Sequence, residues 1–108
     1  MIQSAFYVLM ALSTGGKSKV ELLDYIFNRS HGRISIWPGT LNTLLDGFEA
    51  NGIVSEQETG ACGSVYVLTE YGRLTYEAEL LSLHTCLDDA LDAVTDALEN
   101  AECERTAI

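Results

Sequence analysis

The sequence predicts a mainly helical α+β fold in which three short helices and a β-hairpin precede one long helix. Three observations lead to this prediction. Apolar residues recur at helical spacing in three separate segments within residues 2–52. Two short apolar segments flank a glycine-containing turn at 59–63, as is typical of a hairpin. Between residues 70 and 100, apolar residues follow alternating steps of three and four, the spacing of a coiled-coil seam.

Composition places the chain among folded proteins of one structural unit. The 108 residues suit a single domain, and a hydrophobic share of 47% favours a packed core. No apolar run approaches the roughly 20 residues that a membrane span needs, and no basic leader precedes the apolar segment at 5–12. The three cysteines are widely spaced and contain no Cys-x-x-Cys pair. We therefore predict a cytoplasmic protein with reduced thiols and without a membrane segment, metal or cofactor.

The charges are unevenly distributed along the chain. The net charge is −10, yet four of the six basic residues fall within residues 17–33, namely Lys17, Lys19, Arg29 and Arg33. Residues 34–72 contain no Lys or Arg, and the last third of the chain is strongly acidic. Proteins that bind phosphates are usually basic on the binding face. The cluster in residues 17–33 is thus the candidate for phosphate contact, and the alternative is that it only keeps the domain soluble.

Residues 2–13 are expected to form the first helix, with Phe6, Leu9, Met10, Leu12 and Ser13 facing inward and Gly15-Gly16 ending it. Ser18 is predicted to cap the second helix, and Glu21, three residues later, completes a capping box. The apolar positions of this helix are Val20, Leu22, Leu23, Ile26 and Phe27. Residues 28–32 favour the turn that ends it.

The third helix is the segment around which the chain is organised. Pro38 suits its first turn, and Gly52 suits the left-handed residue that ends it before a strand. One face is predicted to be buried, and it consists of Leu41, Leu44, Leu45 and Phe48. The outward positions are Asn42, Thr43, Asp46 and Gly47. Trp37 is interpreted as a core anchor, with a ligand-pocket residue as the alternative.

Strands are predicted at 53–58 and 64–68, and Thr69 is a predicted cap for a last helix from about Glu70 to Asn100. The apolar seam of this helix would lie open to water unless another copy of the chain covers it. We therefore expect a homodimer whose contacts are made by Leu80, His84, Leu87, Leu91, Val94 and Leu98. The organisation that follows is a domain at 1–69 and a dimerisation helix with its tail at 70–108, together forming one structural unit.

Several motifs occur in an order that resembles a known family. They are Gly32-Arg33-Ile34-Ser35, Pro38-Gly39-Thr40-Leu41, Glu49, Gly52-Ile53-Val54 and Tyr66-Val67-Leu68-Thr69-Glu70-Tyr71-Gly72-Arg73. The chain resembles the PadR-like winged helix-turn-helix transcriptional regulators, in their short form with one C-terminal dimerisation helix. The resemblance implies a DNA-binding regulator, acting as a repressor and as a homodimer on a pseudo-palindromic operator.

The chain departs from the family pattern on the surface that would meet DNA. Asn42 replaces the usual Tyr, Asp46-Gly47 lies where a basic pair is usual, and the wing tip at 61–64 has no Lys or Arg. A second hypothesis accommodates these departures. In it the protein is a winged-helix dimer that has lost DNA binding and acts as a protein-interaction module.

The candidate DNA contacts can be named residue by residue. Lys17, Lys19 and Arg33 would contact phosphates, and backbone N–H groups near Thr40 would add an uncharged phosphate contact. Asn42 and Thr43 would read base edges, since Asn suits adenine. The expected partners are a second copy of the chain, double-stranded DNA and a small apolar effector in a cleft at the dimer interface. The sequence contains no glycine-rich phosphate loop and no His pair at metal spacing, so we predict no enzyme activity.

Overall fold

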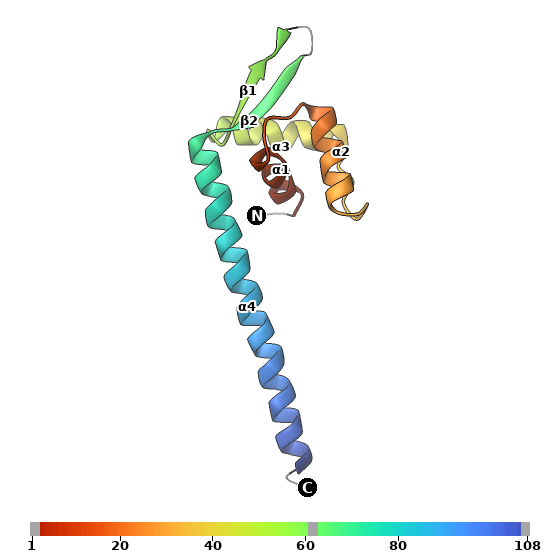
Figure 1. Ribbon diagram of the computed structural model, residues 1–108, viewed down its shortest axis with the longest axis vertical. Coiled ribbons are helices and arrows are strands. Elements are labelled where there is room, and N and C mark those ends of the chain that lie inside the picture. Colours follow the sequence, from red (N-terminus) through yellow and green to blue (C-terminus); the bar gives the residue numbers. More distant parts are fainter. Residues whose placement is uncertain (1–2, 61–62, 107–108) are drawn as a thin grey trace. The chain divides into compact units, whose positions relative to one another are not determined.

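The computed structural model describes residues 3–60 and 63–106 and confirms the predicted fold class (Figure 1). The described part contains four helices and one two-stranded antiparallel sheet. In chain order these are α1 (Gln3–Ser13), α2 (Lys19–Arg29), α3 (Pro38–Ala50), β1 (Val54–Glu58), β2 (Ser64–Leu68) and α4 (Glu70–Thr106). The chain divides into two compact units, Met1–Glu77 and Ala78–Ile108, which are described separately.

The core of the first unit is formed by all three short helices and the hairpin. Its buried members are Val8, Leu9, Ala11, Leu12, Leu22, Ile26, Leu41, Leu45, Val54 and Tyr66. The inward face predicted for α1 is confirmed only at Leu9 and Leu12: Phe6 and Met10 are half-buried, and Ser13 is exposed. The other buried residues of α1 are Ala5, Val8 and Ala11. Phe6 is half-buried and stacks on Tyr76, with ring centroids 5.4 Å apart.

The capping box at the start of α2 is confirmed. The Ser18 N–H donates to Glu21 Oε1 at 3.1 Å, and the Glu21 N–H donates to Ser18 Oγ at 3.3 Å. Beyond the helix end, His31 and Gly32 both have positive φ, and the Gly32 N–H donates to the Phe27 carbonyl at 2.8 Å. Two of the predicted apolar positions are exposed, since Val20 and Phe27 lie on the outer side of α2.

The start, end and buried face of α3 agree with the prediction. Leu41 and Leu45 are fully buried, and Leu44 and Phe48 are half-buried. Gly52 has φ of 73°, and the Ile53 N–H donates to the Phe48 carbonyl at 2.8 Å, so the chain turns directly from α3 into β1.

The prediction that Trp37 anchors the core is wrong, because 79% of Trp37 is exposed. Trp37 is the N-cap of α3 and has extended backbone angles, φ −70° and ψ 144°. Successive side chains of an extended segment point to opposite sides. Ile34 and Ile36 pack against the core, and Trp37 therefore points away from it.

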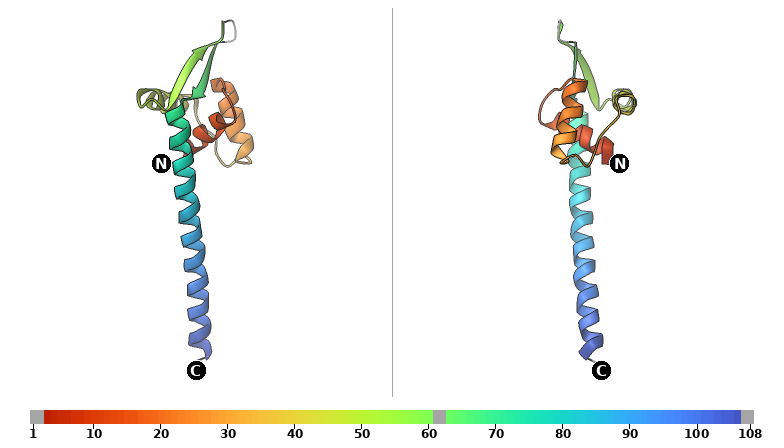
Figure 2. Two further views of the ribbon diagram at one scale, coloured as in Figure 1. Left: turned by 60° about the vertical axis from the view of Figure 1, so that its left-hand side comes forward. Right: turned by 90° about the vertical axis from the view of Figure 1, so that its right-hand side faces the viewer.

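The hairpin pairs β1 with β2 in a register that runs from Val54 opposite Leu68 to Glu58 opposite Ser64. Figures 1 and 2 show it projecting from the three short helices. Lys17 extends the pairing by one bridge to Tyr66, with backbone hydrogen bonds of 3.0 and 2.8 Å. Ala61 and Cys62, at the predicted wing tip, lie outside the described residues.

The first turn of α4 lies against the start of β1. The Thr69 N–H donates to the Ile53 carbonyl at 3.0 Å, and Thr69 Oγ1 accepts the Gly72 N–H at 2.9 Å, which confirms Thr69 as the cap. Gly72 is buried, and a Cβ added there would lie 2.0 Å from the Ile53 carbonyl oxygen. The glycine is thus required by a close backbone approach.

The second unit consists of the rest of α4, which continues to Thr106, past the predicted end at Asn100. The predicted seam residues Leu80, Leu87, Leu91, Val94 and Leu98 are all exposed, from 48% at Leu80 to 64% at Leu98. His84 Nδ1 lies 3.3 Å from Asp88 Oδ2 on the same helix. No helix in the described part of the chain is apolar and long enough to cross a membrane.

Candidate nucleic-acid interface

The outer face of α3 is polar, exposed and made of small side chains. Asn42, Thr43, Asp46 and Gly47 are all exposed, as predicted. The Thr43 hydroxyl donates to the Gly39 carbonyl at 3.1 Å, so it is already engaged within the helix. A Cβ placed at Gly39 or Gly47 would meet nothing within 4 Å. Small residues therefore leave room for another molecule to approach the helix closely.

The N-terminus of α3 has free backbone donors. Its N-cap, Trp37, makes no side-chain capping bond, and the first paired donor is the Leu41 N–H, 3.0 Å from the Trp37 carbonyl. Pro38 has no N–H, so Gly39 and Thr40 present the unpaired donors of the first turn. A helix N-terminus also carries partial positive charge. This end of α3 is therefore suited to an anionic oxygen.

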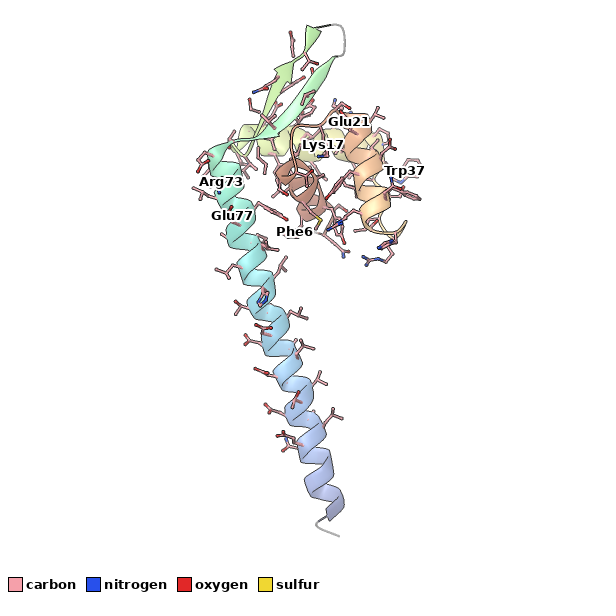
Figure 3. All side chains as sticks on the ribbon, viewed as in Figure 1. Phe6, Lys17, Glu21, Trp37, Arg73 and Glu77 are labelled. Atoms are coloured by element: carbon pink, nitrogen blue, oxygen red, sulfur yellow. The ribbon has the colours of Figure 1, made fainter. Side chains whose placement is uncertain are left out.

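Lys17 and Lys19 lie at the N-terminal end of α2, near the hairpin, but their ammonium groups differ in the contacts that they already make within the protein. The Lys17 ammonium donates to Thr14 Oγ1 and lies 5.1 Å from the centre of the Tyr25 ring (Figure 3). Lys19 is exposed, and its ammonium lies 5.9 Å from the Tyr66 ring centre. Lys19 is thus the freer cation of the two.

An open groove of about 390 Å³ separates this end of α2 from the hairpin. It is lined by Ser18, Lys19, Val20, Glu56, Ser64 and Tyr66. Because Glu56 shares the groove with Lys19, the groove is not uniformly basic.

Arg29 and Arg33 lie at the opposite end of α2. The helix has 11 residues and therefore rises about 16 Å between the two pairs of cations. Arg33 Nε donates to the Ser30 carbonyl at 3.1 Å, and Arg33 Nη2 lies 3.4 Å from the Tyr7 hydroxyl. The structure therefore separates the basic cluster of the sequence into two pairs rather than one patch.

Acidic groups accompany the cations on this unit. Asp46 and Glu49 belong to α3, and Glu56 and Glu58 belong to β1. The hydrogen bond from the Ser18 N–H lowers the pKa of Glu21, so this carboxylate remains ionised beside Lys17 and Lys19.

Arg73 is held within α4 by two carboxylates. Its guanidinium lies 2.6 Å from Glu70 and 2.7 Å from Glu77 (Figure 3). The hydrogen bond from Arg73 lowers the pKa of Glu70, and Glu70 raises the pKa of Arg73 in return. Arg73 is therefore already neutralised and offers little to an external phosphate.

The exposed Trp37 is the residue of this surface that sequence reasoning misplaced. It is the N-cap of α3 and precedes Gly39 and Thr40 in the sequence. Figure 3 labels its side chain. The signal that would have found it is the alternation Ile34, Ile36 in the extended segment before Pro38, which leaves position 37 on the outer side.

No protein-family model and no curated protein matches the chain, whereas several solved structures do. A transcriptional regulator from Clostridium thermocellum aligns with a TM-score of 0.73 and 17% identity, over 79% of this chain and 84% of that one. A PadR family transcription regulator from Clostridium difficile aligns with a TM-score of 0.68 and 14% identity, over 79% and 91%. A winged-helix DNA-binding protein from STIV gives 0.67 and 29% identity, over 78% and 89%. The chain therefore has a PadR-like winged-helix fold.

Proposed function

We propose that the protein is a DNA-binding transcriptional regulator that acts as a homodimeric repressor. The observation that carries the proposal is the exposed face of α3 with its free N-terminal donors, placed on a fold shared with regulators and with a winged-helix DNA-binding protein. In this proposal residues 1–69 bind DNA, and residues 70–108 hold two copies together.

On DNA, α3 enters the major groove with its N-terminal residues against the base edges, as recognition helices do. Asn42 and Thr43 read bases, and the N–H groups of Gly39 and Thr40 bind a phosphate. Lys19 contributes a second phosphate contact. Lys17 and Arg33 contribute only after their ammonium and guanidinium groups leave Thr14 and Tyr7. From these three cations, two to three charged phosphate contacts per protomer are therefore expected, besides the uncharged one at Gly39 and Thr40.

The dimer of this proposal forms through the exposed seam of α4. Removing apolar surface from water gains about 25 cal/mol per Å², and the seam offers a continuous row of half-exposed Leu and Val side chains. A two-fold dimer requires an operator with two half-sites about one DNA turn apart. A small apolar effector between the two copies remains a prediction of the same proposal.

A second candidate function is a protein-interaction module that has lost DNA binding. Asp46 on α3, Glu56 and Glu58 on β1, and the internal contacts of Lys17 favour this alternative. Its α4 seam would be used in the same way, so only DNA binding separates the two candidates.

The deciding experiment is fluorescence anisotropy with a labelled duplex from the region upstream of the protein's own gene, titrated at several salt concentrations. Each neutralised phosphate contributes about −0.9 to the slope of log affinity against log salt, so a dimer should give about −3.6 to −5.4. Lys19→Gln should make the slope shallower by about 0.9 per protomer. Arg73→Gln removes the same charge from an already paired guanidinium and should leave the slope unchanged.

Reversing Lys19 and Arg33 to Glu together should abolish binding. Failure of the wild type to bind at low salt, with binding restored by Asp46→Arg, would establish the interaction module instead.

A further inference from the structure

We propose that Asp46 is a base-reading residue and that α3 recognises adenine through Asn42 and cytosine through Asp46. This inference rests on the proposed function and names the kind of operator that it serves. It gives Asp46 a base-reading role in addition to that of a repelling charge.

The exposed face of α3 presents few side chains that can reach a base. At 100° per residue, the arc that faces away from Leu41 and Leu45 has Asn42 at one edge and Thr40 at the other, and between them lie Asp46, Gly39, Ala50, Thr43 and Gly47. Three of these are Gly or Ala, which cannot make a hydrogen bond through a side chain. The Thr43 hydroxyl already donates a hydrogen bond to the Gly39 carbonyl, 3.1 Å away. Thr40 belongs to the first turn, where its N–H is assigned to a phosphate, so Asn42 and Asp46 are the polar side chains left to read bases.

Both side chains are free to engage a ligand. Both are exposed, and within the described residues neither side chain makes a hydrogen bond or an ion pair. Glu49 differs, because it lies closer to the buried side of the helix than Asn42 or Asp46 and is four residues after the buried Leu45. Its carboxylate therefore adds charge near the groove without occupying the centre of the face.

The chemistry of the two groups selects different bases. An Asn amide pairs with N6 and N7 of adenine, and an Asp carboxylate accepts from the N4 amino group of cytosine. Guanine is usually read by Arg or Lys, and α3 contains neither residue. Direct readout by α3 should thus favour adenine and cytosine and leave guanine contacts out.

The spacing of the two residues sets the spacing of the bases. Four residues of α-helix rise about 6 Å, and successive base pairs are about 3.4 Å apart. The two readers therefore match bases about two positions apart along the groove. Thr43, which lies between them in the sequence, carries a methyl group of the kind that contacts a thymine methyl group.

The test is selection from a library of duplexes with 16 random base pairs, carried out with the full-length wild type and three variants. The wild type should enrich an adenine and a cytosine about two positions apart, each favoured about 5- to 150-fold over other bases. Asn42→Ala should lose the adenine preference only. Asp46→Asn should exchange cytosine for adenine at its position, because the carboxylate becomes an amide of the same shape.

Glu49→Gln is the matched control, since it removes the same charge from the same helix. Both Asp46→Asn and Glu49→Gln should tighten binding by reducing repulsion, but only Asp46→Asn should change the selected sequence. An unchanged sequence with Asp46→Asn, or enrichment with no adenine and cytosine at this spacing, would overturn the inference while leaving DNA binding intact. Absence of any binding to the library in anisotropy would overturn the proposed function together with it.

Discussion

Replacing Gly72 by alanine is expected to destabilise the first unit, although alanine favours helices over glycine. Helix propensity alone would make Gly72→Ala stabilising by up to about 1 kcal/mol. The new Cβ, however, would lie 2.0 Å from the Ile53 carbonyl oxygen and 2.9 Å from its carbon. Both atoms are backbone, so no side-chain rotation relieves the contact, and the two segments must separate by about 1 Å.

The separation affects a group of hydrogen bonds at the same point. The Thr69 N–H donates to the Ile53 carbonyl at 3.0 Å, and the Thr69 hydroxyl lies 2.6 Å from the Gly52 carbonyl oxygen. Overpacking typically costs 1–3 kcal/mol, and a weakened hydrogen bond costs about 1 kcal/mol more. After the propensity gain we expect a net loss of about 2 kcal/mol, or about 8–16 °C in Tm.

Thermal and urea unfolding monitored by circular dichroism at 222 nm would measure this loss. Gly47→Ala is the matched control, because Gly47 lies within α3, is exposed and has open space around a Cβ. It should stabilise the protein by about 0.5–1 kcal/mol. Equal stabilisation by both alanines would refute the close approach of α4 to the start of β1.

Four further predictions concern α2, α3 and α4. Ser18→Ala should cost about 1 kcal/mol by removing the cap of α2, measured by urea unfolding, and retained stability would show that the capping box contributes little. The Ser18 N–H lowers the pKa of Glu21, so the stability from this contact should be fully present above the ordinary Glu pKa of about 4.5. It should decline as the pH falls through the lowered pKa of the folded state. Glu21→Gln should lose this pH dependence of stability, and a pH profile identical to that of the wild type would exclude the contact as its source. Asp46→Arg should tighten binding to duplexes of unrelated sequence in anisotropy at low salt, where no cytosine contact is lost, and weaker binding to them would mean that α3 does not face DNA. Changing Leu87 and Leu91 to Asp should give monomers or aggregates in analytical ultracentrifugation, whereas an unchanged dimer would place the interface elsewhere.

Sequence patterns predicted the elements that depend on local chemistry. The box formed by Ser18 and Glu21, the start of α3 at Pro38 and its end at Gly52 all follow from residues within one helical turn. The buried positions Leu41 and Leu45 follow from helical periodicity in the same way. Such signals need no knowledge of the rest of the fold.

Contacts between distant segments were not accessible from local patterns. The role of Gly72 depends on the Ile53 carbonyl, and the freedom of Lys17 and Arg33 depends on Tyr25 and Tyr7. Because these partners come from other elements, a list of cations near one another in sequence could not show that α2 separates them. Phe6 of α1 was misplaced for a related reason, since it is apolar but packs on Tyr76 at the edge of the core.

The central claim, that DNA lies against the N-terminal end of α3, is tested most directly by the emission of Trp37. It is the single tryptophan of the chain, and it is 79% exposed at the N-cap of that helix. Titrating the full-length protein with unlabelled upstream duplex at low salt should change its emission along the same curve as anisotropy of the labelled duplex. Binding seen in anisotropy with no change in Trp37 emission would contradict the claim.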